Sequence, residues 1–134
     1  MSQTHIAAAL RRKVHARASL RCEYCMIHED DCFLGCEVDH IISEKHGGTT
    51  DETNLAFCCF YCNRHKGSDL STLGAKGRLI RLFNPRKDLW EEHFAFQALH
   101  IIGISSIGKA TAKLLRFNDP ARLEERAAMT RPRR

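Results

Sequence analysis

Apolar residues recur at helical spacing near the start of the chain. Ile6, Leu10, Val14 and Ala18 follow one another every four residues. This spacing places them on one face of an amphipathic helix, which we expect to end before Arg21. The basic residues beside this stripe are typical of a solvated helix face.

The middle of the chain alternates short apolar runs with polar loops. β-Branched residues predict a strand at 36–42, and a second strand is expected at 54–58. The polar segment 28–35 and the glycine-containing segment 47–51 are expected to be loops. A short helix is predicted from Tyr61 to Gly67, where a glycine suits the left-handed conformation that ends many helices.

The pattern of the second half predicts strands followed by helices. The expected elements are, in order, a connection at 67–77, strands at 78–83, 90–96 and 99–104, and helices from 105 to 115 and from 120 to 129. Asn84-Pro85 is a turn-forming pair between the first two of these strands. Ser105 or Ser106 can cap the first helix, and Asp119-Pro120 supplies a cap and a first-turn proline for the second. Together these patterns predict an α+β fold.

Length and charge narrow the classes of function. The chain has 134 residues, which fits one domain over 1–134, and its net charge of +5 favours an anionic partner such as nucleic acid. Charge alone fits an unspecialised basic surface equally well. The sequence has no apolar run of the ~20 residues that a membrane span requires and no secretory signal. We therefore expect a cytoplasmic protein with reduced thiols and no membrane contact.

Two cysteine pairs carry the spacing of a zinc site. Cys22-x-x-Cys25 and Cys59-x-x-Cys62 can supply four thiolates in a tetrahedron, which leaves no open position and is typical of structural zinc. The segment between the pairs would then be clamped at both ends by the metal. The alternative is that the cysteines are buried as small apolar side chains.

Three further cysteines lie outside these pairs. Cys58 directly precedes Cys59 and is expected to pack in the interior. Cys32-x-x-x-Cys36 is an alternative ligand pair, although its spacing is not that of a knuckle.

A set of polar residues between the cysteine pairs has no evident role in folding. Asp39 stands beside His40 at the end of an apolar run, Asn54 follows fourteen residues later, and Asn63 comes directly after Cys62. Each of them alone could be a cap or a turn residue. Together they provide oxygen ligands for a hard cation and a base that can take a proton from water, as metal-assisted hydrolysis of a phosphate ester requires.

The order of these motifs resembles the HNH family of endonucleases, in the branch with a four-cysteine zinc. The shared elements are Cys-x-x-Cys, Val-Asp-His-Ile, a Gly-Gly loop leading to Asn-Leu, and Cys-x-x-Cys-Asn-x-x-Lys-Gly, all within residues 21–68. The resemblance implies a zinc-stapled ββα-metal finger at 21–68 as the nuclease core. An N-terminal helix would precede this finger, and a strand-plus-helix extension at 78–129 would support it.

The resemblance also implies a role for each polar residue. His40 would be the general base, and Asp39 would be a carboxylate ligand of a catalytic Mg²⁺ or Mn²⁺ ion. Asn54 would brace the loop that holds His40. Asn63 would be the second protein ligand of the metal. This third position holds asparagine where the family name has histidine, so the pattern is His-Asn-Asn. An oxygen-only ligand pair suits Mg²⁺ or Mn²⁺ better than catalytic zinc.

The expected substrate is DNA, and three residues after the second cysteine pair are expected to contact it. Lys66 lies three residues after Asn63 and so on the same helix face, while Arg64 and His65 are its neighbours. His65 is also a possible substitute ligand for the metal. The alternative to an endonuclease is a non-catalytic zinc-dependent DNA-binding module, and a zinc-stapled protein-interaction domain is a further one.

Overall fold

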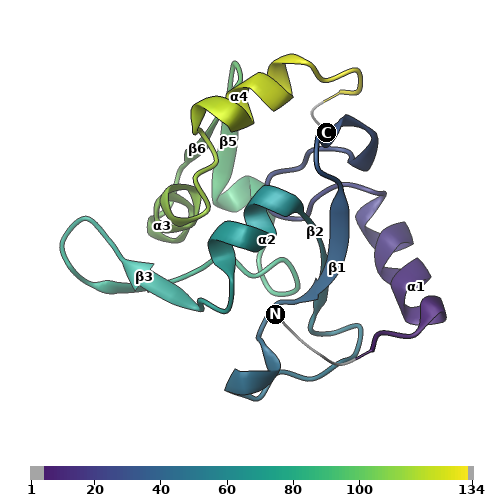
Figure 1. Cartoon of the computed structure of the whole chain (residues 1–134). Coiled ribbons are helices and arrows are strands. Elements are labelled where there is room, and N and C mark those ends of the chain that lie inside the picture. Colours follow the sequence, from purple (N-terminus) through teal and green to yellow (C-terminus); the bar gives the residue numbers. More distant parts are fainter. Residues whose placement is uncertain (1–4, 133–134) are drawn as a thin grey trace.

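The computed structural model describes residues 5–132, and its first helix is α1 (Ala8–Ala18). The predicted apolar stripe is confirmed. Val14 and Ile6 are buried, and Leu10 and Ala18 pack against the same cluster, although Ile6 precedes the first residue of the helix. α1 lies along one side of the strand pair that follows it (Figure 1).

The centre of the fold is a hairpin followed at once by a helix. β1 (Cys36–His40) pairs antiparallel with β2 (Leu55–Cys59), and α2 (Phe60–Lys66) begins directly after β2. α2 contacts the hairpin from the side opposite α1 (Figure 1). The predicted strand–loop–strand–helix order is therefore confirmed, with β1 ending two residues earlier and α2 beginning one residue earlier than expected.

The second half contains two more hairpins and two helices. Its elements are β3 (Ser71–Leu73), β4 (Leu79–Arg81), β5 (Phe94–Gln97), β6 (His100–Gly103), α3 (Ser106–Leu114) and α4 (Pro120–Ala127). β3 pairs with β4, and β5 pairs with β6. Ser105 caps α3, with its Oγ accepting a hydrogen bond from the amide of Gly108 at 2.9 Å. Short 3₁₀ turns occur at Glu29–Asp31, Glu44–His46 and Trp90–Glu92.

The strand predictions for this half are partly wrong. The expected connection 67–77 contains β3, and the expected strand 90–96 begins as a 3₁₀ turn. The segment around Asn84 does not make a hairpin turn between β4 and β5. Instead, the Asp88 carboxylate accepts hydrogen bonds from the Asn84 amide at 2.8 Å and from Arg81 at 2.7 and 2.9 Å, which closes a local loop. β5 can then pair with β6 through a two-residue turn in which Ala98 has φ +53°.

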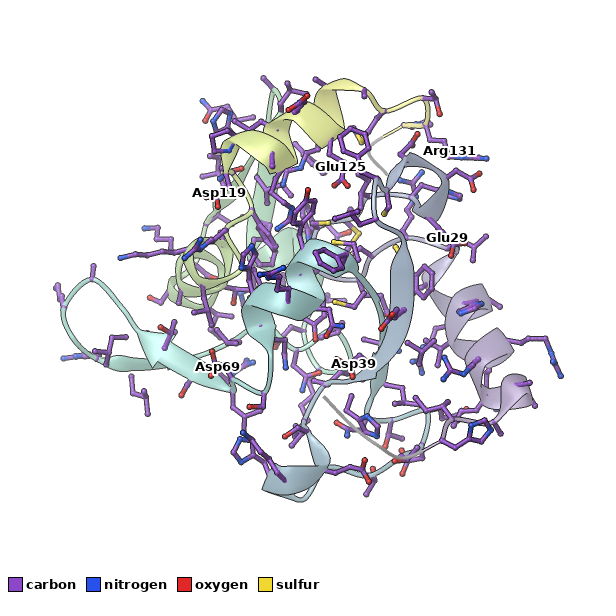
Figure 2. All side chains as sticks on the ribbon, in the orientation of Figure 1. Glu29, Asp39, Asp69, Asp119, Glu125 and Arg131 are labelled. Atoms are coloured by element: carbon purple, nitrogen blue, oxygen red, sulfur yellow. The ribbon has the colours of Figure 1, made fainter. Side chains whose placement is uncertain are left out.

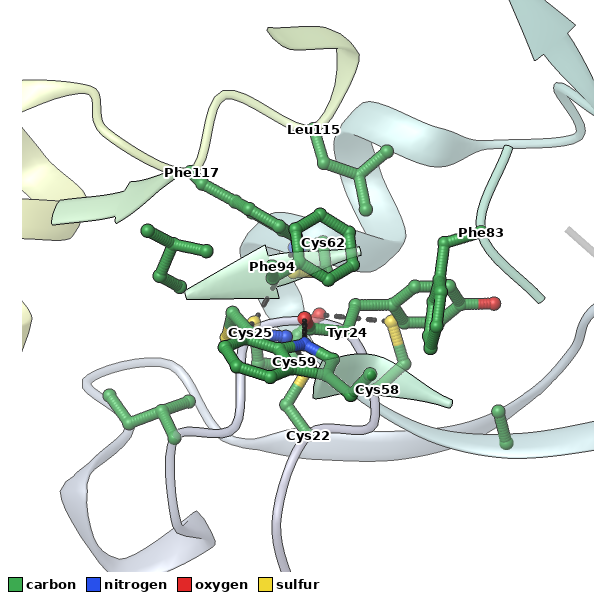
Figure 3. Close-up of a cluster of buried hydrophobic side chains, with 14 of the residues drawn as sticks. Cys22, Tyr24, Cys25, Cys58, Cys59, Cys62, Phe83, Phe94, Leu115 and Phe117 are labelled. Atoms are coloured by element: carbon green, nitrogen blue, oxygen red, sulfur yellow. Dashed lines mark hydrogen bonds between the residues drawn. The ribbon is translucent and has the colours of Figure 1, made fainter. Parts of the chain in front are cut away.

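The main hydrophobic core surrounds the cysteine pairs. Phe94, Phe117 and Leu115 from the second half pack over the sulfur atoms (Figure 3). The result is a small α+β fold whose antiparallel strand pairs and four helices fit a zinc-stapled HNH architecture. Within residues 5–132 no helix combines the length and the apolar character needed to cross a membrane.

Candidate active site

The four cysteines of the two pairs meet in the interior. All four are buried, and their sulfur atoms lie within 4.8 Å of one another. The Sγ atoms of Cys25 and Cys59 are 3.7 Å apart, close to the spacing of about 3.8 Å expected for tetrahedral thiolates at Zn–S bonds of about 2.3 Å. This donor set and spacing fit a structural zinc ion.

Each pair forms a knuckle through its own backbone. The amide of Cys25 donates to Cys22 Sγ at 3.5 Å, and the amide of Cys62 donates to Cys59 Sγ at 3.5 Å. Cys59 is also the N-cap of α2, so the second knuckle fixes where that helix begins. Among the described residues every cysteine is a free thiol. Cys32 and Cys36 are not members of the four-cysteine group, and their sulfurs lie 3.3 Å from each other.

The end of β1 presents Asp39 and His40 to opposite faces of the hairpin. Asp39 is half-buried and lies opposite Ala56, whereas His40 is buried opposite Leu55. Nε2 of His40 is 2.8 Å from Thr50 Oγ1. In the described part of the chain, Nδ1 of the same ring is buried and has no hydrogen-bond partner.

Asn54 ties together the loop between the two strands. Its Oδ1 accepts from the amide of Ile42 at 3.0 Å, and its Nδ2 donates to the carbonyls of Ile42 at 2.9 Å and Thr49 at 2.8 Å. Gly48 lets the loop approach this closely, because a Cβ there would lie 1.7 Å from the Ile42 carbonyl oxygen. The residue after the His40-bearing strand is held as well, since the Ile41 amide donates to the Asn54 carbonyl at 2.9 Å.

Asp39 and Asn63 share a groove between β1 and α2. Successive turns of α2 and alternate residues of β1 face each other there, and the space between them is about 370 Å³. The other lining residues are Leu34, Gly35, Glu37, Phe60, Arg64 and Gly67. A smaller cavity is lined by Asp39, His40, Asn63 and Lys66, together with Tyr24, Ala56 and Cys58. Figure 2 shows Asp39 near the end of β1, next to α2.

The three residues that were expected to contact DNA lie in different environments. Arg64 is exposed, lines the groove, and its guanidinium lies 5.9 Å from the centre of the Phe60 ring. His65 is not among the groove residues. Burial, followed by the charge of Arg116, lowers the pKa of His65. The spacing of α2 turns this side chain away from Asp39, which gives no support to His65 as a substitute ligand.

The expectation that Lys66 contacts phosphate needs correction. Lys66 is buried, and its Nζ donates to the carbonyl oxygen of Ile41 at 2.7 Å. The helix face that carries Asn63 also packs on the end of β1, so the amine serves an internal backbone carbonyl and is not a surface cation. Burial lowers the pKa of this amine.

Two groups important for this geometry were not found from the sequence. Thr50 holds the His40 ring, and Arg17 donates to the carbonyls of Glu52 and Leu55 at 2.7 Å each. Thr50 stands in a Thr-Thr-Asp run that reads only as a loop. Arg17 was placed on a solvated helix face, and only its packing on the hairpin shows that it anchors the start of β2.

The comparison with protein families identifies this part of the chain. Residues 22–69 match the family model of the HNH endonuclease. The matched HNH domain contains both cysteine pairs, β1, β2, α2 and the groove. HNH domains are found in nucleases that act on nucleic acid, usually DNA. No curated protein and no solved structure matches the chain.

Proposed function

We propose that this protein is a metal-dependent endonuclease that hydrolyses DNA phosphodiester bonds. The observation that carries the proposal is the state of His40. Its Nδ1 is buried without a hydrogen-bond partner among residues 5–132, and His40 lines a small cavity together with Asp39 and Asn63. A buried imidazole nitrogen normally has a partner, so an exception beside possible metal ligands indicates a catalytic group.

His40 is the general base in this proposal. With the proton on Nε2, that atom donates to Thr50 Oγ1, and Nδ1 keeps a lone pair that can accept a proton. Nδ1 then takes a proton from the water that attacks the phosphorus atom. Thr50 and Asn54 act as positioning residues, because the first orients the ring and the second fixes the loop around it.

Asp39 and Asn63 are the proposed ligands of the catalytic divalent ion, which gives a His-Asn-Asn site. Both side chains line the groove and the small cavity, and they offer a carboxylate oxygen and an amide oxygen. Hard oxygen ligands favour Mg²⁺ or Mn²⁺. When bound, such an ion neutralises charge on the phosphate oxygens and on the leaving oxygen.

The groove gives the substrate a path past these residues. Arg64 lines it and is exposed, which fits a contact to a phosphate next to the one that is cut. The net charge of +5 favours a polyanion in the same place. The cysteines among the described residues form no disulfide, which fits the proposed cytoplasmic location, where the compartment is reducing.

Nicking of supercoiled plasmid tests the proposal. We expect relaxed and then linear DNA with added Mg²⁺ or Mn²⁺, and none after removal of free divalent ions, with zinc content measured in the same samples. DNA binding that weakens with salt, but without nicking in any metal, would instead support a zinc-dependent DNA-binding module. Such a module needs only the four cysteines, so it leaves the unpartnered nitrogen of His40 unexplained.

Replacing Asn54 by alanine is expected to lower both stability and nicking. The change leaves the amide and carbonyl of Ile42 and the carbonyl of Thr49 without their partner, at a cost of about 2–4 kcal/mol in the free energy of unfolding. The measurements are urea unfolding and the initial nicking rate under conditions where the variant is folded.

Asn118 provides the matched control for this variant. Its side chain makes the same double contact with one backbone residue, Ile101, at 2.9 Å for both hydrogen bonds, in the second half of the chain. Asn118→Ala should therefore lose stability but keep the nicking rate of the folded protein. Equal nicking rates in the two folded variants would show that Asn54 has no positioning role.

A further inference from the structure

An arginine from the last helix reaches the cysteine cluster. Arg122 of α4 is only 1% exposed, and its Nη2 lies 3.1 Å from Cys62 Sγ and 3.8 Å from Cys59 Sγ. Its Nη1 donates to the carbonyl oxygen of Leu115 at 2.9 Å. The chain thus brings a full positive charge to two of the four sulfur atoms across about sixty residues of sequence.

The guanidinium is held in this position by aromatic rings. Its central carbon lies 5.2 Å from the centre of the Tyr61 ring and 5.7 Å from that of Phe117. A planar guanidinium that stacks on rings and has a fixed fork of donors loses little further entropy when it binds an anion. The contact with sulfur is therefore preorganised.

The buried thiolate cluster and the buried guanidinium of Arg122 carry opposite charges, and each stabilises the other. Four thiolates around Zn²⁺ have a formal net charge of –2, and all four cysteines are at most 3% exposed. Backbone amides of the two knuckles contribute only dipoles. A buried arginine is equally unfavourable without an anion nearby.

We infer that Arg122 is the counter-ion of the four-cysteine zinc site. Its guanidinium donates to the thiolates of Cys62 and Cys59, lowers the net charge of the buried cluster and slows the loss of the metal. Partners of this kind, one step removed from a metal, commonly change affinity by about 10–100-fold. The inference concerns the zinc site alone and holds whether or not the protein cuts DNA.

A role for the extension follows from this assignment. α4 is then part of the metal centre and not only a support for the core. Glu125 of the same helix adds a second link. Its carboxylate accepts a hydrogen bond at 3.0 Å from the amide of Phe33, which lies in the loop before β1. Two separate segments of the HNH domain, the loop before β1 and the second cysteine pair, are therefore connected to the same helix.

Arg126 provides a matched control one turn further along α4. It is also buried, at 4% exposed, but its guanidinium donates to backbone carbonyls of Leu99, at 2.8 Å, and of Phe117. Its replacement removes a buried guanidinium from the same helix without touching the sulfurs. A purely structural effect of losing a buried arginine should therefore appear in both variants.

The test compares Arg122→Met, Arg122→Lys and Arg126→Met as zinc-loaded full chains. Zinc transfer to an excess of a coloured chelator is followed at a temperature where each protein is folded by circular dichroism. We expect release about 10–100-fold faster in Arg122→Met, an intermediate rate in Arg122→Lys, and a rate within about twofold of wild type in Arg126→Met. Equal acceleration in Arg122→Met and Arg126→Met, or none in Arg122→Met, would overturn the assignment.

Substitution of cobalt for zinc gives a second readout, an absorption band whose energy does not depend on the stability of the fold. Loss of a charged donor raises the energy of the thiolate electrons, so the sulfur-to-cobalt charge-transfer band should shift to lower energy in Arg122→Met. Arg122→Lys should show a smaller shift. If Arg122→Met does not fold, the test is made with Arg122→Lys alone. An unmoved band in both Arg122 variants, or the same shift in Arg126→Met, contradicts the proposal.

Discussion

Replacing His40 by alanine is expected to lower the rate of plasmid nicking by about 10²–10⁴-fold, the usual contribution of a positioned general base. The alanine side chain cannot take the proton of the attacking water, while Asp39 and Asn63 remain beside the groove. Initial rates in Mg²⁺ or Mn²⁺ measure the effect. Zinc content and the thermal unfolding curve of the same samples show whether the variant is folded.

His93 provides a matched control for this substitution. Its ring is partly buried and also contacts a hydroxyl, with Nδ1 2.6 Å from Ser105 Oγ, but it lies in the second half of the chain. His93→Ala should lose stability and keep the nicking rate of the folded protein. If His40→Ala cuts DNA as fast as wild type, another group must be the base.

The pH profile of nicking gives independent evidence on the same residue. Only a neutral imidazole can accept a proton, so a mechanism with a histidine base predicts a nicking rate that falls toward acid pH. The measurement is the initial nicking rate from neutral to acid pH at constant ionic strength. A rate that stays flat well into acid argues against His40 as the base.

Replacing Cys62 by serine is expected to unfold the HNH domain. Zinc binding contributes about 10–16 kcal/mol in small zinc-finger peptides, which is comparable to the whole stability of a typical domain, about 5–15 kcal/mol. Cys62 is fully buried among the three other ligands, and Asn63 follows it directly on α2. Loss of the site should therefore remove zinc, the cooperative unfolding transition and nicking together.

Cys58 is the control for loss of a buried thiol. It is 3% exposed and adjoins Cys59, but it is not one of the four clustered sulfurs. Cys58→Ala should keep one zinc per chain and a cooperative transition, with a modest loss of stability. A folded, zinc-free Cys62→Ser protein would show that hydrophobic packing alone holds the domain, which is the alternative of cysteines as small apolar side chains.

The sequence predicted the parts of the candidate site that depend on the spacing of residues close together in the chain. The two knuckles, the strand carrying Asp39 and His40, and the helix carrying Asn63 lie where they were expected, because zinc-ligand spacing and strand alternation are local properties. The roles implied by the family resemblance stay predictions.

The features that the sequence did not reveal depend on contacts between distant segments. Helix spacing placed Lys66 on the same face as Asn63. Only the packed structure shows that its amine donates a hydrogen bond to the carbonyl oxygen of Ile41. Arg122 sits in an ordinary charged helix sequence, and nothing local indicates that its guanidinium enters the core.

The place of Arg122 after the HNH domain in the sequence also implies an order of assembly. Translation delivers the cysteines, β1, β2 and α2 first, and domains begin to fold as their segments emerge. A nascent HNH domain would thus bind zinc while its thiolate cluster still lacks the guanidinium of α4. The nascent chain would hold its metal loosely, and docking of α4 would convert it into a tightly loaded protein.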